Sequence, residues 1–131
     1  MIVSFDFDDT LLWTVPCLDF GSIPAGPNPS MLMRLKAHAR LGHTIVIITT
    51  RIERLEDCHK GMSNVVHFVE MHDLPVESIH FTNGKLKHDT IKRLGVSIHH
   101  DDCEEELERL PEGVEGVLAE VHPDWEGFEF P

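Results

Sequence analysis

Three aspartates and a threonine stand close together near the N-terminus, directly after an apolar run. The stretch IVSFDFDDTL places Asp6, Asp8 and Asp9 beside Thr10. Carboxylates repel one another and lose hydration energy next to a buried strand, so something must offset that cost. A divalent cation would do so, and hard oxygen ligands without thiolates favour Mg²⁺ over zinc. The stretch therefore predicts a magnesium site that includes Asp6 and Asp8.

Further polar residues follow later apolar runs in the chain. In order they are Thr49, Thr50, Lys85, Lys87, Asp101 and Asp102. In a parallel sheet, ligands gather beyond the carboxyl ends of the strands, so these side chains are expected at one edge. Carboxylates from two strand ends can share a cation, and an added ammonium and hydroxyl complete a cage for a phosphoryl group. The pattern predicts chemistry on a phosphoryl group.

The elements that must hold these residues alternate between strands and helices. Strands are expected over 2–5, 44–48, 76–81, 96–100 and 114–119. Helices are expected over 30–41, 85–94 and 103–110, with a mostly helical stretch, split by Gly61, over 52–72. Such alternation indicates right-handed β-α-β units. We therefore predict an α/β fold with a Rossmann-like parallel sheet of about five strands and helices on both faces.

Local signals refine two of these segments. Ser30 is the expected N-cap of the first helix and Gly42 its stop, with Leu41 on the apolar stripe. The segment 11–29 carries four prolines and two glycines, which predicts a loop or a tight flap rather than a long regular element.

Four ordered segments resemble the motifs of the haloacid dehalogenase (HAD) superfamily of phosphohydrolases. They are FDFDDTL, IVIITTR, a lysine, and HHDD, and together they span about residues 2–102. The resemblance implies a Rossmann-like sheet, Mg²⁺ as cofactor and an aspartyl-phosphate intermediate. Neither 11–29 nor the stretch after Phe81 has room for the inserted cap domain of many members, so the resemblance is to the small capless type.

The resemblance also implies roles for the matching residues. Asp6 would be the nucleophile and a metal ligand. Asp8 would protonate the leaving oxygen, later deprotonate the attacking water, and lend its backbone carbonyl to the metal. Thr49 would bind a phosphoryl oxygen, while Asp101 and Asp102 would complete the magnesium site.

The lysine motif has two candidates, Lys87 and Lys85, of which we prefer Lys87. Asp9, Thr10 and Thr50 are expected to join these residues in binding phosphate. Asp9 stands where many members carry glycine, and aspartate tolerates turn conformations.

The expected function is that of a magnesium-dependent phosphatase. An open site suits a bulky phosphoester such as a nucleotide, a nucleic-acid end or a phosphoprotein, unless a neighbouring subunit of a homo-oligomer closes it. The alternative is a non-catalytic phosphate-binding or phosphoacceptor module. A response-regulator receiver of that kind carries its aspartate after the third strand, where this chain has Phe81 and Thr82.

Three more residue groups have structural interpretations. Arg51 is expected to pair with a surface acid more readily than with substrate. The adjacent His99 and His100 point to opposite faces of a strand, so at most one reaches the site. The tail aromatics Trp125, Phe128 and Phe130 are expected to pack onto the domain.

Composition limits the remaining possibilities. The net charge is −12, and residues 101–131 hold 12 acidic side chains against Arg109 alone, a field that repels nucleic-acid backbones. Three cysteines without a C-x-x-C pair argue against a disulfide framework, and no apolar run spans a membrane, so a cytoplasmic protein is expected. We expect one domain over 1–131, with the motifs in 1–102 and an acidic helix, strand and tail in 103–131.

Overall fold

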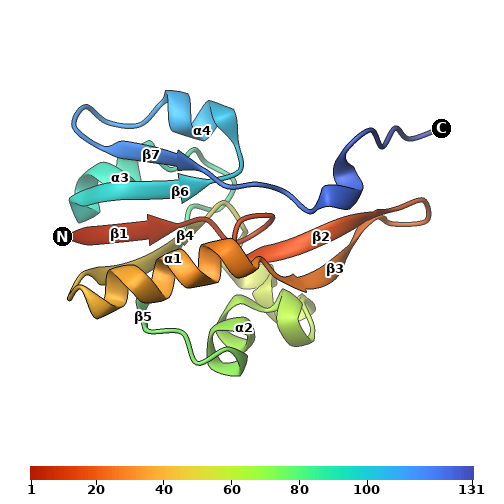
Figure 1. Cartoon of the computed structure of the whole chain (residues 1–131), viewed down its shortest axis with the longest axis horizontal. Helices are drawn as coiled ribbons and strands as arrows, with labels where there is room; N and C mark the ends of the chain where they lie inside the picture. The colour runs from red at the N-terminus through yellow and green to blue at the C-terminus, as the bar shows by residue number, and fades with distance from the viewer.

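A five-stranded parallel sheet forms the centre of the molecule (Figure 1). The computed structural model describes all 131 residues, and the strand order is β5-β4-β1-β6-β7. The strands are β1 Ile2–Phe5, β4 Thr44–Thr49, β5 Val76–Phe81, β6 Val96–Asp101 and β7 Glu115–Leu118. The predicted α/β class is confirmed, and each predicted strand lies within one residue of its observed ends.

The central strand sets the position of its neighbours. The side chains of Val3, Ser4 and Phe5 are fully buried, as an apolar run covered on both faces requires. Phe5 pairs in register with Ile47 of β4 and with His100 of β6. The residues that follow these three strands therefore emerge at the same edge of the sheet.

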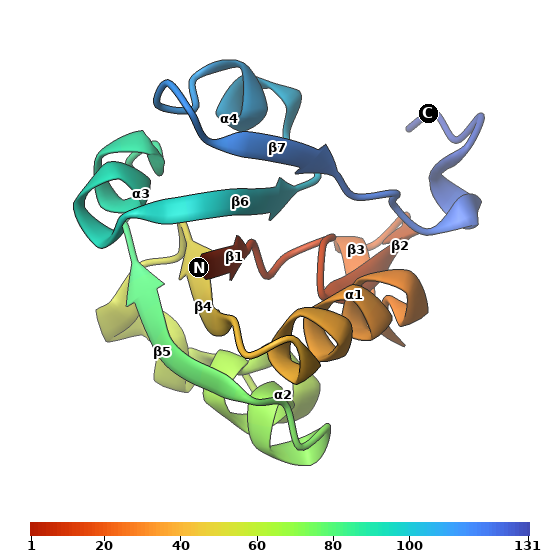
Figure 2. The same cartoon turned by 60° about the vertical axis from the view of Figure 1, so that its left-hand side comes forward.

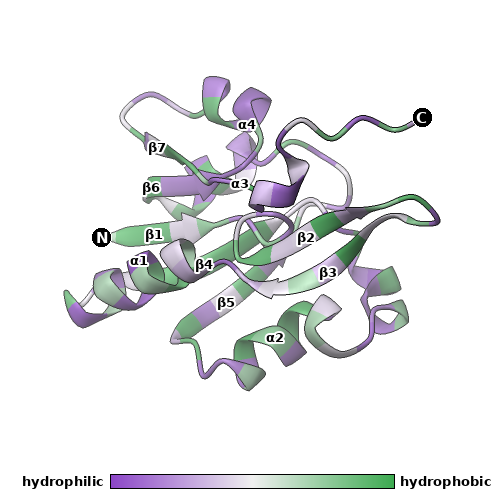
Figure 3. Cartoon of the chain, turned by 45° about the vertical axis from the view of Figure 1, so that its right-hand side comes forward, coloured by the Kyte–Doolittle hydropathy of each residue, from purple (hydrophilic) through white to green (hydrophobic).

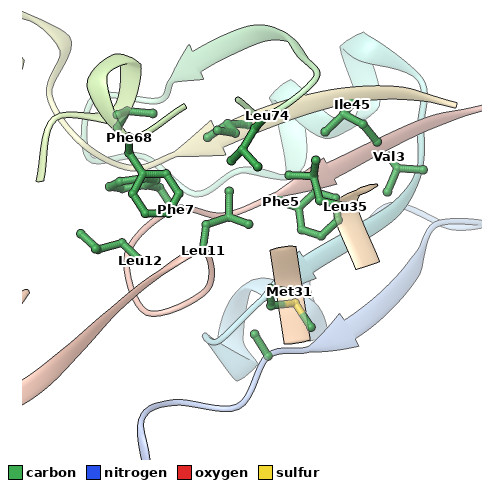
Figure 4. Close-up of a cluster of buried hydrophobic side chains, with 13 residues drawn as sticks. Val3, Phe5, Phe7, Leu11, Leu12, Met31, Leu35, Ile45, Phe68 and Leu74 are labelled. Carbon is green, nitrogen blue, oxygen red and sulfur yellow. The ribbon is translucent and has the colours of Figure 1, made fainter. Parts of the chain in front are cut away.

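Helices cover both faces of the sheet, as predicted (Figure 2). On one side, α1 (Pro29–Arg40) and α2 (Val65–Met71) contribute Leu35 and Phe68 to the main core around Phe5 and Phe7 (Figure 4). On the other side lie α3 (His88–Leu94) and α4 (Glu104–Glu108). The smaller core of that side is formed by Val46, Ile48, Ile91 and Val96. Each fully buried side chain of this kind contributes roughly 1.5–3 kcal/mol.

Several helix ends differ from the sequence prediction. The N-cap of α1 is Asn28 rather than Ser30, because Pro29 at the first helical position needs no hydrogen-bond acceptor. Leu41 is exposed and lies beyond the end of that helix. Helix α3 begins at His88 rather than at Lys85. Asn83 and Gly84 adopt φ values of 55° and 87°, which form a turn that a helix cannot contain.

The stretch 52–72 is less regular than a mostly helical pattern suggests. It contains two short 3₁₀ segments, η1 (Glu53–Cys58) and η2 (Gly61–Ser63), before α2 begins. Gly61 has a φ of 55°, so the backbone changes direction at the position where the sequence predicted a split.

The predicted loop over 11–29 is instead a two-stranded antiparallel hairpin of β2 (Leu12–Cys17) and β3 (Gly21–Pro27). Prolines do not prevent it, because both strands are edges and a missing N–H can face outward. Pro16 pairs with Ser22, and Thr14 pairs with Pro24. The expectation that prolines exclude a regular element here was wrong.

The segment after β7, residues 119–131, leaves the sheet and packs against this hairpin. Trp13 Nε1 donates to the Glu120 carbonyl at 2.9 Å, and Trp125 Nε1 donates to the Thr14 carbonyl at 2.8 Å. Trp125 thus packs as expected, whereas Phe130 is exposed and does not. No helix in the structure has both the length and the apolar character that crossing a membrane requires.

Candidate functional site

Three carboxylates meet where β1 and β6 end side by side. The backbone N–H of Asp6 donates to the His100 carbonyl at 2.9 Å, which continues the parallel pairing past the last residue of β1. One oxygen each of Asp6, Asp101 and Asp102 lies within 4.8 Å of the others. Asp6 and Asp101 are buried, and Asp102 is partly buried. The sheet register thus brings together acids that are separated by about a hundred residues in the sequence.

Lys87 is the cation that faces these acids. Its Nζ donates to Asp6 Oδ1 at 2.9 Å and to Asp101 Oδ2 at 2.5 Å, and its side chain is 3% exposed. The turn after β5 and the start of α3 aim it inward. Lys85, by contrast, is exposed in the turn itself. The structure therefore brings Lys87, and not Lys85, to the acids.

Glu106 of α4 fixes the position of Lys87. Its Oε1 accepts the backbone N–H of Lys87 at 3.0 Å, and its Oε2 lies 3.7 Å from Nζ. The sequence did not single out this buried glutamate, because it lies in a predicted helix that is rich in acidic side chains.

The turn after Phe7 places Thr10 among the acids and Asp9 at their rim. Thr10 Oγ1 lies 3.0 Å from Asp6 Oδ2 and 3.4 Å from Asp102 Oδ1. Asp9 has a φ of 60°, the left-handed conformation that favours glycine. Its Oδ1 accepts hydrogen bonds from the Thr14 N–H at 3.1 Å and the Thr14 hydroxyl at 2.6 Å. Those bonds stabilise the turn in place of a glycine.

Asp8 is paired with Arg51. The guanidinium donates from Nε to Asp8 Oδ2 at 2.9 Å and from its second terminal nitrogen to Oδ1 at 2.8 Å. The Asp8 side chain is 46% exposed, whereas that of Arg51 is 10% exposed. A bidentate pair fixes the plane of the carboxylate as well as its place. Arg51 thus contacts a predicted catalytic residue rather than a surface acid.

Arg51 is in turn held by groups that the sequence did not single out. Glu56 accepts from it at 3.0 and 3.2 Å, the Ser63 carbonyl accepts another bond, and the guanidinium lies 4.8 Å from the Phe7 ring centre. Glu56 Oε1 also accepts the Val65 N–H at 2.7 Å, which joins it to the start of α2. The irregular stretch 52–64 therefore serves to hold Arg51.

The two threonines after β4 have different surroundings. Thr49 is buried, and its hydroxyl lies 3.3 Å from the Arg51 N–H as an acceptor. Thr50 is exposed and lines the same small cavity as Asp6 and Lys87. Of the predicted pair, Thr50 borders the cavity directly.

A buried hydrogen-bond chain supports Asp101 from within the sheet. His99 Nε2 lies 2.8 Å from Asp101 Oδ2, and its Nδ1 lies 2.7 Å from Ser4 Oγ. The other carboxylate oxygen of Asp101 accepts the Cys103 N–H at 3.0 Å. His100 lies on the opposite face and stacks on Phe5. Because successive side chains of β6 point to opposite faces of the sheet, His99 faces the site and His100 faces the main core.

Electrostatics at this cluster are strongly unbalanced. Burial raises the pKa of Asp6 well above its ordinary range, an effect that Lys87 opposes and Asp101 reinforces. Burial also raises the pKa of Asp102. For Asp101, burial acts the same way but is outweighed by the hydrogen bond from His99 and the charge of Lys87, which lower its pKa to about 2. Three carboxylates thus share one ammonium.

The donor set fits a hard divalent cation, of which Mg²⁺ is one. The acids line a cavity of about 220 Å³ together with Asp8, Thr50 and Lys87. The clustered ligand atoms are all carboxylate oxygens, the type that hard divalent cations prefer. A cation there would oppose both the burial and the repulsion from Asp101 that raise the pKa of Asp6.

Comparison with known proteins yields structural likeness only. No protein-family model matches the sequence, and no curated protein sequence is similar to it. A chain in the structure of the Pnkp1/Rnl/Hen1 RNA repair complex is similar, with a TM-score of 0.64 and 13% identity over 92% of this chain and 42% of that one. A chain in a second structure of the Pnkp1/Rnl/Hen1 complex has a TM-score of 0.61 and 15% identity over 91% and 45%. This chain therefore spans less than half of either, and the likeness at such identity concerns the fold.

Proposed function

We propose that the protein is a magnesium-dependent phosphatase that acts through phosphorylation of Asp6. The observation that carries the proposal is the meeting of Asp6, Asp101 and Asp102 with Lys87 at one sheet edge, in a cavity large enough for a phosphoryl group. The resemblance of the four motifs to the HAD superfamily and the likeness of the fold to a chain of an RNA repair complex support a phosphoryl-transfer role.

Each residue has a task in this scheme. Asp6 attacks phosphorus and forms a P–O bond as the ester P–O bond breaks, and Asp8 gives its proton to the departing alcohol oxygen. Asp8 then takes a proton from the water that releases phosphate from Asp6. Lys87 and Thr50 line the cavity and would bind the phosphoryl oxygens. Asp6, Asp101 and Asp102 would hold Mg²⁺, which would supply further positive charge against the phosphoryl group.

Arg51 is a positioning residue for Asp8 in the scheme. Its bidentate contact fixes the place and the plane of the carboxylate that accepts a proton from water in the second step. In the first step one oxygen of Asp8 must leave Arg51 to carry a proton. A lysine in place of Arg51 would contact only one oxygen.

The second candidate function is a non-catalytic magnesium- and phosphate-binding module. The same cluster of acids and Lys87 would serve it equally well. The feature that favours the enzyme is Asp8, because a binding module needs no proton donor and no arginine to orient one.

The test is phosphate release from an aryl phosphate by purified protein, with Mg²⁺ and with a chelator, beside Asp6→Asn and Asp8→Asn. Magnesium-dependent turnover that Asp6→Asn abolishes supports the phosphatase. A wild-type protein that binds Mg²⁺ and beryllium fluoride without turnover supports the binding module instead.

A further inference from the structure

A second hollow adjoins the candidate site. It has a volume of about 590 Å³ and shares Asp102 with the smaller cavity that contains Asp6 and Lys87. Leu118, Ala119 and Val121, at the end of β7 and just beyond it, supply apolar lining, and Trp125 supplies an aromatic wall. A group esterified to a phosphate held beside Asp6 has this hollow next to it.

The charged side chains that line the hollow are of one sign. Four carboxylates line it, those of Asp102, Glu104, Glu120 and Glu126, and no lysine or arginine does. The last thirty-one residues, which supply all of its lining, hold 12 acidic side chains and one arginine. A concave wall lined by one sign of charge attracts ligands of the opposite sign.

The hollow is held in shape by hydrogen bonds to the hairpin. The Glu120 carbonyl accepts from Trp13 Nε1 at 2.9 Å and from Asn28 Nδ2 at 3.2 Å. The Trp125 indole N–H donates to the Thr14 carbonyl. The His122 ring packs edge-on to the Trp13 ring, with 5.0 Å between the ring centres. Figure 3 shows the short helical turn that contains Trp125 as hydrophilic and lying beside β2. The wall is therefore in place before a ligand arrives.

We propose that this hollow binds the leaving group of the substrate, and that this group is a small organic cation, an alcohol that carries an ammonium. The inference rests on the proposed phosphatase function and names its substrate class. An ammonium is attracted by Glu104, Glu120 and Glu126, the carboxylates of the hollow that are not assigned to the metal, and it suits the indole of Trp125. Its methyl or methylene groups suit the apolar lining. A nucleotide or nucleic-acid end would instead bring further negative charge against the carboxylates.

The experiment compares two phosphoesters of the same shape and different charge. Choline phosphate carries a quaternary ammonium, and 3,3-dimethylbutyl phosphate has a neutral carbon in its place. We expect kcat/KM for choline phosphate to be higher by about tenfold, since both salt-bridge and cation–π contributions at such sites are modest. Equal rates, or faster hydrolysis of a 3′-phosphorylated oligonucleotide, would overturn the inference.

Variants that remove a charge from the hollow test whether the preference for choline phosphate arises there. Glu120→Gln and Glu126→Gln should each reduce the preference for choline phosphate over the neutral ester by about threefold. Glu112→Gln, an exposed acid that does not line the hollow, is the matched control and should change neither rate. A preference that survives in both variants counts against this location.

A binding measurement separates this inference from the proposed function. Choline itself, titrated into the wild-type protein, should shift the NMR signal of the Trp125 indole N–H, and 3,3-dimethylbutanol should shift it less. If no phosphoester is hydrolysed but choline shifts that signal selectively, the phosphatase fails and the cation site stands. If choline gives no selective shift, the cation site is wrong whether or not aryl phosphate is hydrolysed.

Discussion

At the scale of single residues, the two lysines near the start of α3 offer the sharpest contrast. Lys87 is buried between Asp6 and Asp101, whereas Lys85 is exposed three residues before the helix begins. We expect Lys87→Met to lower kcat/KM for an aryl phosphate by at least about a hundredfold, because a preorganised charge on the phosphoryl group is lost. For Lys85→Met, kcat/KM should stay within about threefold of the wild-type value. Comparable losses in both variants would contradict the assignment.

Arg51 leads to a second prediction about a single side chain. Arg51→Lys should lower kcat by about tenfold to a hundredfold with little change in KM, because one ammonium cannot hold both oxygens of Asp8. Arg54→Lys, in an exposed neighbour, is the control. A change in KM alone would show that Arg51 binds substrate instead.

At the scale of elements, β6 contains a histidine that resists protonation. The His100 ring stacks on Phe5 at 4.0 Å, its Nδ1 lies 3.0 Å from the Ser4 carbonyl, and Arg34 of α1 lies 3.5 Å from its Nε2. Burial, with further contributions from Arg34 and His38, lowers the pKa of His100 to about 4.

The consequence is a loss of stability in weak acid. The folded pKa lies below the unfolded value of roughly 6.5, so the unfolded chain binds the proton first and stability falls as pH drops from about 6.5 towards 4. Between pH 7 and pH 5 we expect a loss of about 2 kcal/mol from this residue, measured by urea unfolding. Between the same two pH values, the His100→Phe variant should lose about 2 kcal/mol less of its free energy of unfolding than the wild type. An equal loss in both proteins would contradict the prediction.

Local pattern and spatial arrangement differ in how well they can be read from the sequence. The parallel strands were predictable because each is a short apolar run with its own boundaries. The hairpin of β2 and β3 was not predictable. Its prolines are tolerated because each strand pairs on one side only, and the sequence does not show that no third strand is present. Asp6, Lys87, Asp101 and Asp102 were foreseen as residues that follow strands. Glu56 and Glu106 were not, because their contacts depend on how helices and strands pack. For His99 and His100 the sequence predicted only that at most one reaches the site, and the structure shows that it is His99.

At the scale of the whole molecule, the charge distribution predicts an unusual response to salt. A net charge of −12 repels polyanionic substrates, and salt screens that repulsion as the Debye length falls from roughly 30 Å at 0.01 M to about 8 Å at 0.15 M. We expect kcat/KM for a 3′-phosphorylated oligonucleotide to rise several-fold over this range. A fall, as seen for proteins that bind nucleic acid through cationic side chains, would contradict the prediction.

The measurement that tests the central claim most directly is mass spectrometry of the Asp8→Asn protein, quenched in acid after incubation with Mg²⁺ and an aryl phosphate. An aryl leaving group departs without a proton donor, whereas release of phosphate by water needs Asp8, so the intermediate should accumulate. We predict one phosphoryl group on the peptide that contains Asp6, and none when Asp6→Asn is added. A phosphoryl group on another residue, or none on the chain while the same protein still releases phosphate, would contradict the account.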